Sequence, residues 1–120
     1  MAGYDVVDVG ELEGEGPGGM VKKLRRAVGA KAFGFNYFTL PPNSEGREHN
    51  HAEENAEEVY FVVKGSGTMR IEGDEVDLRP GRFIRVDPAS TRMPSSGADG
   101  LEFVTFGAPI DGQYEPPSWG

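Results

Sequence analysis

The residues best suited to chemistry in this chain are its two histidines, His49 and His51, which lie in the stretch GREHNHAEENAEEVYFVVKGSG and are followed by several glutamates. Residues at positions i and i+2 of an extended segment point to the same side, so both imidazoles can reach one point. Imidazole and carboxylate groups are common ligands of divalent metal ions. The pair therefore indicates half of a metal site, which a downstream carboxylate would have to complete.

Four glutamates could supply that carboxylate, namely Glu53, Glu54, Glu57 and Glu58. Glu53 and Glu54 lie in the polar segment AEENA, which is typical of a loop, and there we expect them to meet water. Glu58 opens the apolar run VYFVVKG and can project from a strand into the interior that the histidines face. Strand alternation would then turn Tyr60 inward as well. We therefore expect Glu58 to be the third ligand.

The rest of the chain favours an all-β domain, because 18 glycines and 9 prolines punctuate short runs of aromatic and β-branched residues. The sequence EGDE predicts a hairpin turn at Gly73 and Asp74, and GSG at 65–67 predicts a turn between strands. The predicted strands are Asp5–Val9, Phe33–Leu40, Val59–Lys64, Thr68–Ile71, Glu75–Leu78, Arg82–Val86 and Leu101–Phe106.

The two ends of the chain have a different character from the middle. Residues 1–19 read as a Gly/Glu-rich flexible lead-in that includes an edge strand. Met20–Val28 has near-helical apolar spacing, so it predicts either one short helix or a strand start followed by a turn. The tail 107–120 is rich in proline, and we expect it to run extended over the surface, held there by Tyr114 and Trp119.

Composition excludes several classes of function. A length of 120 residues fits one domain, 1–120, with a real core. The net charge of -8 opposes binding to nucleic acid and to anionic membranes. The absence of cysteine excludes disulfides and thiolate ligands. Because the N-terminus does not resemble a signal peptide and no apolar run approaches about 20 residues, we expect a soluble, cytoplasmic protein with no nucleic-acid or membrane partner.

The histidine stretch resembles the first sequence motif of the cupin superfamily, in which a glycine precedes His-x-His, a glutamate follows, and a second glycine comes six residues later. His49 and His51 match the histidine pair, Glu58 the glutamate and Gly65 the second glycine. Gly46 lies only two residues before His49, and the segment from His51 to Glu58 is longer than is usual in the family. This resemblance implies a metal-binding loop with a lengthened connection.

A second stretch, GRFIRVDPASTRMPSS, keeps the spacing of the second cupin motif but not its residues. Gly81 matches the opening glycine, while Asp87 stands at the proline and Ala89 at the second glycine. Arg92 stands where the family has its fourth metal ligand, a histidine, and Ser96 where it has an asparagine. The resemblance therefore supports the fold more strongly than the function.

The resemblance spans about residues 33–106, which would form the barrel core. It implies an all-β double-stranded β-helix, the jelly-roll or cupin barrel, with a small-molecule pocket at one mouth. Cupins commonly pair as dimers, partly by exchanging terminal strands, so a homodimer is expected here. The residues expected around the pocket are Arg92, Tyr60, Tyr37 and Asn36.

Arg92 leaves three interpretations open. First, His49, His51 and Glu58 hold a divalent metal such as Fe, Mn, Ni or Zn, and the protein acts on a small molecule as an oxygenase or isomerase. Second, Arg92 pairs with Glu58 or binds an anionic ligand in a metal-free pocket. Third, the interior polar groups satisfy one another and the barrel serves only association. The sequence does not decide whether the protein is an enzyme.

Overall fold

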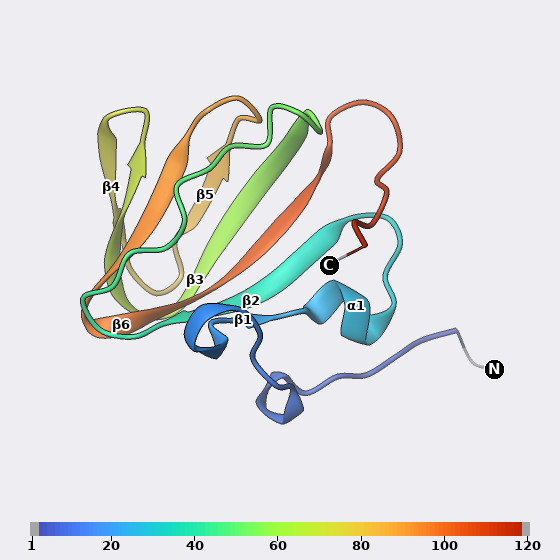
Figure 1. The fold of residues 1–120 in the computed structure, drawn as a ribbon, viewed down its shortest axis with the longest axis horizontal. Helices are drawn as coiled ribbons and strands as arrows, with labels where there is room; N and C mark the ends of the chain where they lie inside the picture. The colour runs from blue at the N-terminus through green and yellow to red at the C-terminus, as the bar shows by residue number, and fades with distance from the viewer. Residues whose placement is uncertain (1–2, 119–120) are drawn as a thin grey trace.

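The computed structural model describes residues 3–118, and the six strands in this part of the chain form one antiparallel sheet (Figure 1). The strands are β1 (Val21–Lys22), β2 (Gly34–Leu40), β3 (Ala56–Ile71), β4 (Asp74–Leu78), β5 (Phe83–Val86) and β6 (Arg92–Pro109). They follow the order β1-β2-β6-β3-β4, and β5 also pairs with β3. The predicted all-β fold class is confirmed.

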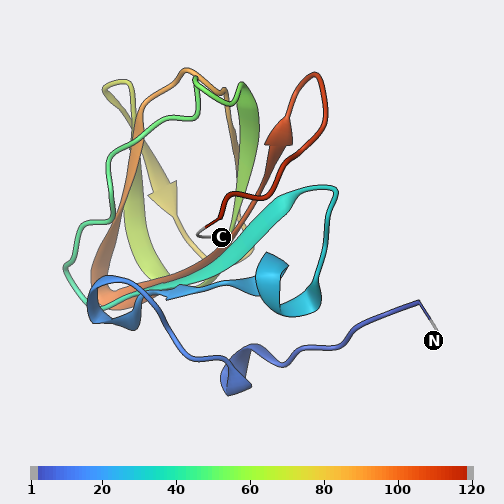
Figure 2. The same ribbon diagram turned by 45° about the vertical axis from the view of Figure 1, so that its right-hand side comes forward.

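Two long strands, β3 and β6, form the centre of the fold. They pair with each other from Ala56 opposite Pro109 to Ile71 opposite Arg92, with register shifts between Val62 and Lys64 and near Gly65. The first half of β3 also pairs with β5 and its second half with β4. The sheet therefore curves round and encloses an interior, as Figure 2 shows.

The interior is filled by alternate residues of these strands. Tyr60 and Val62 point inward from β3, as strand alternation from an inward Glu58 requires, and both are almost fully buried. Phe103 of β6 stacks on Phe38 of β2 with ring centroids 5.0 Å apart. The buried core consists of Leu40, Tyr60, Val62, Met69, Leu78, Ile84, Val86, Leu101 and Phe103.

Several predicted element boundaries are wrong because β3 and β6 continue where turns were expected. The GSG segment at 65–67 lies inside β3 and is not a turn. It carries the register shift that bends this strand. Likewise, the strand predicted at Leu101–Phe106 is only the second half of β6, which begins at Arg92. A bulge preserves pairing while changing direction, so glycine here indicates curvature and not chain reversal.

The hairpin between β3 and β4 lies one residue earlier than predicted. Its two central residues are Glu72 and Gly73, and both have positive φ, 49° and 94° respectively. Ile71 and Asp74 then pair directly across the strands. Positive φ at both central positions defines a type I′ turn, whose twist matches that of the flanking strands.

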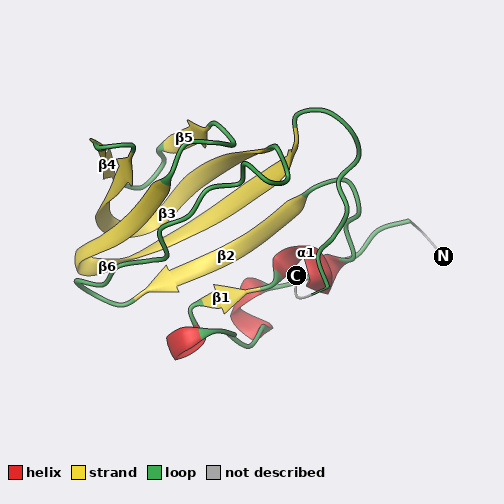
Figure 3. Cartoon of the chain, turned by 45° about the horizontal axis from the view of Figure 1, so that its top comes forward, coloured by secondary structure: helices red, strands yellow, loops and turns green. Residues whose placement is uncertain are grey.

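The ends of the chain also differ from expectation. The strand predicted at Asp5–Val9 is wrong, since the lead-in described from residue 3 to 19 forms two 3-10 turns, Val9–Glu11 and Pro17–Gly19. The segment Met20–Val28 contains both alternatives, because β1 precedes the helix α1 (Leu24–Val28), which lies beside β2 (Figure 3). Trp119 lies outside the described residues. None of the helices in residues 3–118 is long and apolar enough to cross a membrane.

A glycine substitution tests the bend in β3. Gly65 has a φ of +93°, and a Cβ atom built on it would lie 2.1 Å from the carbonyl oxygen of Gly100. Gly73 has nearly the same φ, +94°, with open space around it. Both Gly65→Ala and Gly73→Ala incur backbone strain of about 1–2 kcal/mol, but only the first forces two strands apart. We expect Gly65→Ala to lower the free energy of unfolding by at least about 2 kcal/mol more than Gly73→Ala in urea denaturation; equal losses would contradict this account.

Candidate metal centre

The loop that carries the two histidines is attached to the sheet by backbone hydrogen bonds. The His49 amide donates to the Arg92 carbonyl at 3.0 Å, and the Arg92 amide donates back to the His49 carbonyl at 2.9 Å. The His51 amide donates to the carbonyl of Pro88 at 2.8 Å. Further back, the Ser96 hydroxyl donates to the Pro41 carbonyl at 2.5 Å. The loop is therefore held along the first half of β6, and both imidazoles point into the barrel.

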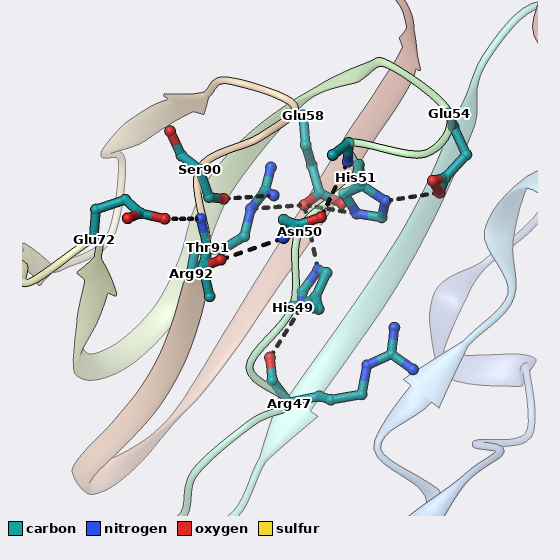
Figure 4. A network of polar contacts seen from close by, with 11 residues as sticks. Arg47, His49, Asn50, His51, Glu54, Glu58, Glu72, Ser90, Thr91 and Arg92 are labelled. Carbon is teal, nitrogen blue, oxygen red and sulfur yellow. Dashed lines mark hydrogen bonds and ion pairs between the residues drawn. The ribbon is translucent and has the colours of Figure 1, made fainter.

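Glu58 reaches the same place from β3 (Figure 4). Its Oε1 atom lies 3.4 Å from His51 Nε2 and 3.8 Å from His49 Nε2. One ligand atom from each of these three residues lies within 4.8 Å of the others. The two imidazole rings are almost perpendicular, at 82°. The structure thus brings together the three residues that the sequence indicates as metal ligands.

The outer nitrogen of each imidazole fixes which tautomer is present. His49 Nδ1 lies 2.9 Å from the Arg47 carbonyl oxygen, which can only accept, so Nδ1 carries the hydrogen. His51 Nδ1 lies 3.2 Å from the carboxylate of Glu54 and donates in the same way. In the neutral rings both Nε2 atoms then present lone pairs to one another and to Glu58 Oε1. Three acceptors therefore converge on one point, which is an arrangement that a cation stabilises.

The pKa values of Glu58 and His51 also indicate that this position favours positive charge. Burial acts to raise the pKa of the Glu58 carboxyl, but its contacts with His49 and His51 outweigh this and hold that pKa at about 2. Contact with Glu58 raises the pKa of His51 above its ordinary value, although burial and Arg92 act to lower it. Glu58 is therefore ionised at neutral pH and attracts a proton or a metal ion to its neighbours.

The donor set fits a divalent metal ion. Within the described part of the chain, His51 Nε2 and Glu58 Oε1 are buried and have no hydrogen-bond partner. Buried polar atoms are normally satisfied, so two such atoms facing each other indicate a missing positively charged partner. Two histidines and one carboxylate with open coordination positions suit ferrous iron, zinc and related divalent ions.

Arg92 is a positively charged residue next to the position that such an ion would occupy. Its side chain is fully buried, and its Nε lies 3.7 Å from Glu58 Oε1, beyond hydrogen-bond length. Its Nη1 donates to the Ser90 carbonyl at 3.0 Å. Two unit charges about 4 Å apart interact by about 4 kcal/mol at an effective dielectric constant near 20. Arg92 therefore partly neutralises Glu58 and also repels a cation bound to it.

A cavity of about 630 Å³ adjoins this centre, and His51 and Glu58 form part of its wall. Thr105 and the C-terminal Tyr114 also line it, and most of its charged groups are carboxylates. The Tyr114 ring lies against Gly34, where a Cβ atom would approach its hydroxyl to 2.8 Å. The volume suits a small molecule.

The four residues expected around the pocket have different environments. Asn36 lines the cavity. Tyr37 does not, because it points to the other face of β2, where its hydroxyl donates to Glu102 Oε1 at 2.6 Å. Tyr60 is 2 % exposed and packs in the core against Phe103. Neither Tyr60 nor Arg92 is part of the cavity wall. Of the four residues expected around the pocket, Asn36 therefore lies on the wall of this cavity, Tyr37 points away from it, and Tyr60 and Arg92 are buried next to it, with Arg92 beside Glu58.

The sequence analysis does not predict two features of this region, namely the contact of Glu54 with His51 and the place of Tyr114 on the cavity wall. Glu54 is exposed to water, as predicted, but it also accepts a hydrogen bond from His51 Nδ1, three residues earlier in the chain, and this contact is not predicted. The signal was local, since Asn50 Oδ1 accepts from the Ala52 amide and starts the turn that brings Glu54 back. Tyr114 has no comparable local signal, because its place on the cavity wall depends on packing against Gly34 of β2, which is far away in the sequence.

Comparison with known proteins agrees with the fold. The family model described as Cupin domain matches residues 36–96, so the chain belongs to the cupin family. A search of curated proteins finds no match. Many solved structures have the same fold.

Three of these solved structures illustrate the range of relatives. A cupin protein from Bacteroides fragilis is 19% identical, with a TM-score of 0.78 and coverage of 98% of this chain and 93% of the other. A predicted oxalate decarboxylase from Thermotoga maritima is 25% identical, with a TM-score of 0.75 and coverage of 88% and 100%. A proposed sugar phosphate isomerase from Acidithiobacillus ferrooxidans is 29% identical, with a TM-score of 0.65 and coverage of 76% and 59%.

The pH dependence of stability tests the electrostatics of this centre in metal-free protein. The raised pKa of His51 gives stability that is present below about pH 6.5 and lost as pH rises through the folded-state pKa. The lowered pKa of Glu58 gives stability that is present above its ordinary value of 4.5 and lost as pH falls toward about 2. Both contributions are complete only between these limits.

We therefore expect the difference in Tm between wild type and His51→Gln, measured in a chelator, to be largest near pH 5–6 and to shrink above pH 7. A difference that stays constant from pH 5 to pH 9 would contradict the proposed contact between His51 and Glu58. Glu58→Gln serves as the matched variant, because it removes the charge that both contributions require.

Proposed function

We propose that this protein is a metal-dependent cupin that holds a divalent cation with His49, His51 and Glu58 and acts on a small molecule bound in the adjoining cavity. The observation that carries the proposal is the convergence of two Nε2 lone pairs and one carboxylate oxygen on one buried point. A proton can occupy such a point, but only a metal ion can join all three atoms at once. The identity of the metal is left to measurement among Fe, Mn, Ni and Zn.

The division of roles follows from the position of each group. A divalent cation bound there would act as a Lewis acid on an oxygen atom of the ligand. Glu54 and the Arg47 carbonyl orient the two imidazoles by accepting their Nδ1 hydrogens. Asn36 and Thr105 offer hydrogen-bonding groups on the cavity wall. Their chemistry suits a small, oxygen-rich ligand.

The names of two relatives support isomerase or related chemistry over a purely structural role. The proposed sugar phosphate isomerase and the predicted oxalate decarboxylase are 29% and 25% identical to this chain. The names of both concern small, oxygen-rich anions. We favour conversion of a small carboxylated or phosphorylated molecule, with an oxygenase as the other metal-dependent possibility.

The metal-free interpretation differs from this proposal in a measurable way. If Arg92 alone supplied the positive charge, a small acid would stabilise the protein in the presence of a chelator. Arg92 Nε and Glu58 Oε1 form an ion pair at 3.7 Å, but the distance is too long for a hydrogen bond, so this contact satisfies neither group fully. We therefore expect small acids to give no rise in Tm until a divalent metal is added.

Metal binding is the direct test of the proposed function. A divalent ion at about 100 times its Kd should stabilise wild type by about 2.7 kcal/mol, or several degrees in Tm. His51→Ala and Glu58→Gln should each lose this stabilisation and the bound metal measured by plasma mass spectrometry. Glu75→Gln is the matched control, since it removes an exposed carboxylate on β4 and should bind like wild type. Equal metal content in wild type and His51→Ala would refute the site.

We also propose that the protein is a homodimer that uses the outer face of β2, β3, β5 and β6. Phe83 is 67% exposed, and its ring lies 4.4 Å from that of Phe61. Apolar sheet faces pack well against each other, and a second copy supplies the same surface across a twofold axis. The exposed apolar side chains on or next to these strands are Phe33, Val63, Phe83 and Phe106.

A charge placed on this face should separate the subunits. We expect Phe83→Glu to convert a dimer into a monomer in size-exclusion chromatography with light scattering. Val6→Glu introduces the same charge at another exposed apolar residue, 77% exposed in the N-terminal segment, and should leave the mass unchanged. A wild-type protein that is monomeric at micromolar concentration would contradict the dimer.

A further inference from the structure

The guanidinium of Arg92 has a pair of donors that the protein does not satisfy. The side chain is fully buried, and its Nη1 is used by the Ser90 carbonyl. Among residues 3–118, its Nε and Nη2 have no hydrogen-bond partner. These two N–H groups lie along one edge of the planar group, and that edge matches the two oxygens of a carboxylate or phosphate. Arg92 thus presents an oxyanion-binding edge inside the barrel.

Glu58 does not fill this edge. Its Oε1 atom is 3.7 Å from Arg92 Nε, and the same oxygen faces His51 Nε2 at 3.4 Å. A hydrogen bond to a charged donor would be shorter than 3 Å. If Glu58 Oε1 binds a metal, it becomes still less available to the guanidinium. Tyr60 also interacts with Arg92, but within residues 3–118 no acceptor forms a hydrogen bond with this edge, which leaves it open to an acceptor on a bound molecule.

Charge balance favours such an acceptor as well. A divalent cation, the guanidinium and the Glu58 carboxylate, with neutral imidazoles, sum to an excess positive charge in a largely buried space. Uncompensated buried charge is strongly unfavourable. We propose that Arg92 makes this a joint site, in which a small oxyanion bridges the divalent cation and the Nε/Nη2 edge. This inference rests on the proposed function and specifies its substrate class as small carboxylates or phosphates.

The cavity wall suggests the order of binding. Glu53, Glu54, Glu57 and Glu115 line the cavity along with Glu58, so its mouth attracts cations and repels anions. The attraction for an anion comes from the metal and Arg92 together. The oxyanion should therefore bind after the cation and increase the affinity for it, since the coupling between two ligands is reciprocal.

Titration of Mn²⁺ followed by electron paramagnetic resonance tests this coupling. The metal-free protein is titrated in chloride, formate or inorganic phosphate at equal ionic strength. We expect the apparent Kd of wild type for Mn²⁺ to fall at least tenfold when formate or phosphate replaces chloride. Response to only one of the two anions would identify which oxyanion the site prefers and would support the proposal.

Variants of the arginine separate charge from geometry. Arg92→Gln should bind Mn²⁺ more tightly than wild type in chloride and lose the effect of the anion. Arg92→Lys keeps the charge without the paired edge, so it should bind weakly in chloride and gain less from the anion. Arg79→Gln is the matched control, since it removes an exposed arginine near Asp77 and should behave like wild type.

The outcomes distinguish this inference from the proposed function. Tight Mn²⁺ binding that is the same in all three buffers would overturn the role of Arg92 and leave the metal site intact. An anion effect retained in full by Arg92→Gln would do the same. Absence of Mn²⁺ binding by folded wild type and folded Arg92→Gln in every buffer would overturn the metal site and this inference together.

Discussion

The central constraint in this protein is that one carboxylate oxygen, Glu58 Oε1, is shared by three nitrogen-bearing groups. His51 Nε2, His49 Nε2 and Arg92 Nε lie 3.4, 3.8 and 3.7 Å from it, and none of these distances is a full hydrogen bond. Polar atoms are costly to bury unless they are paired. This cluster is therefore held in place by the surrounding fold, with buried polar atoms that its own members pair only incompletely.

The fold meets this constraint with its two long strands. β3 presents Glu58 inward, and β6 begins at Arg92 and holds the histidine loop through paired backbone hydrogen bonds. A slip of one residue between these strands would turn Glu58 to the outer face and destroy the centre. The bend near Gly65 lets the same strands enclose the core without breaking their pairing. Architecture and site thus depend on the same register.

The sequence predicted the members of the cluster better than their surroundings. His49, His51 and Glu58 were recognisable because alternation in strands and the i, i+2 spacing are local rules. The spacing of the second motif located Arg92 at the missing ligand, but not where its guanidinium points, since that depends on packing from several strands. Glu54 is exposed as its polar segment predicts, but its contact with His51 depends on a turn that the sequence analysis does not include. Local patterns therefore predicted which residues form the cluster, while tertiary contacts determine how these residues interact.

Membership of the cupin family establishes the barrel, whereas Arg92 is the feature that separates this chain from the family's four-ligand pattern. The central claim is that a cation joins His49, His51 and Glu58 beside that arginine. Anomalous diffraction at the zinc edge from crystals soaked in Zn²⁺ tests it most directly. We predict a peak about 2.0–2.2 Å from both Nε2 atoms and from Glu58 Oε1. Peaks confined to exposed carboxylates, with none inside the barrel, would contradict the account.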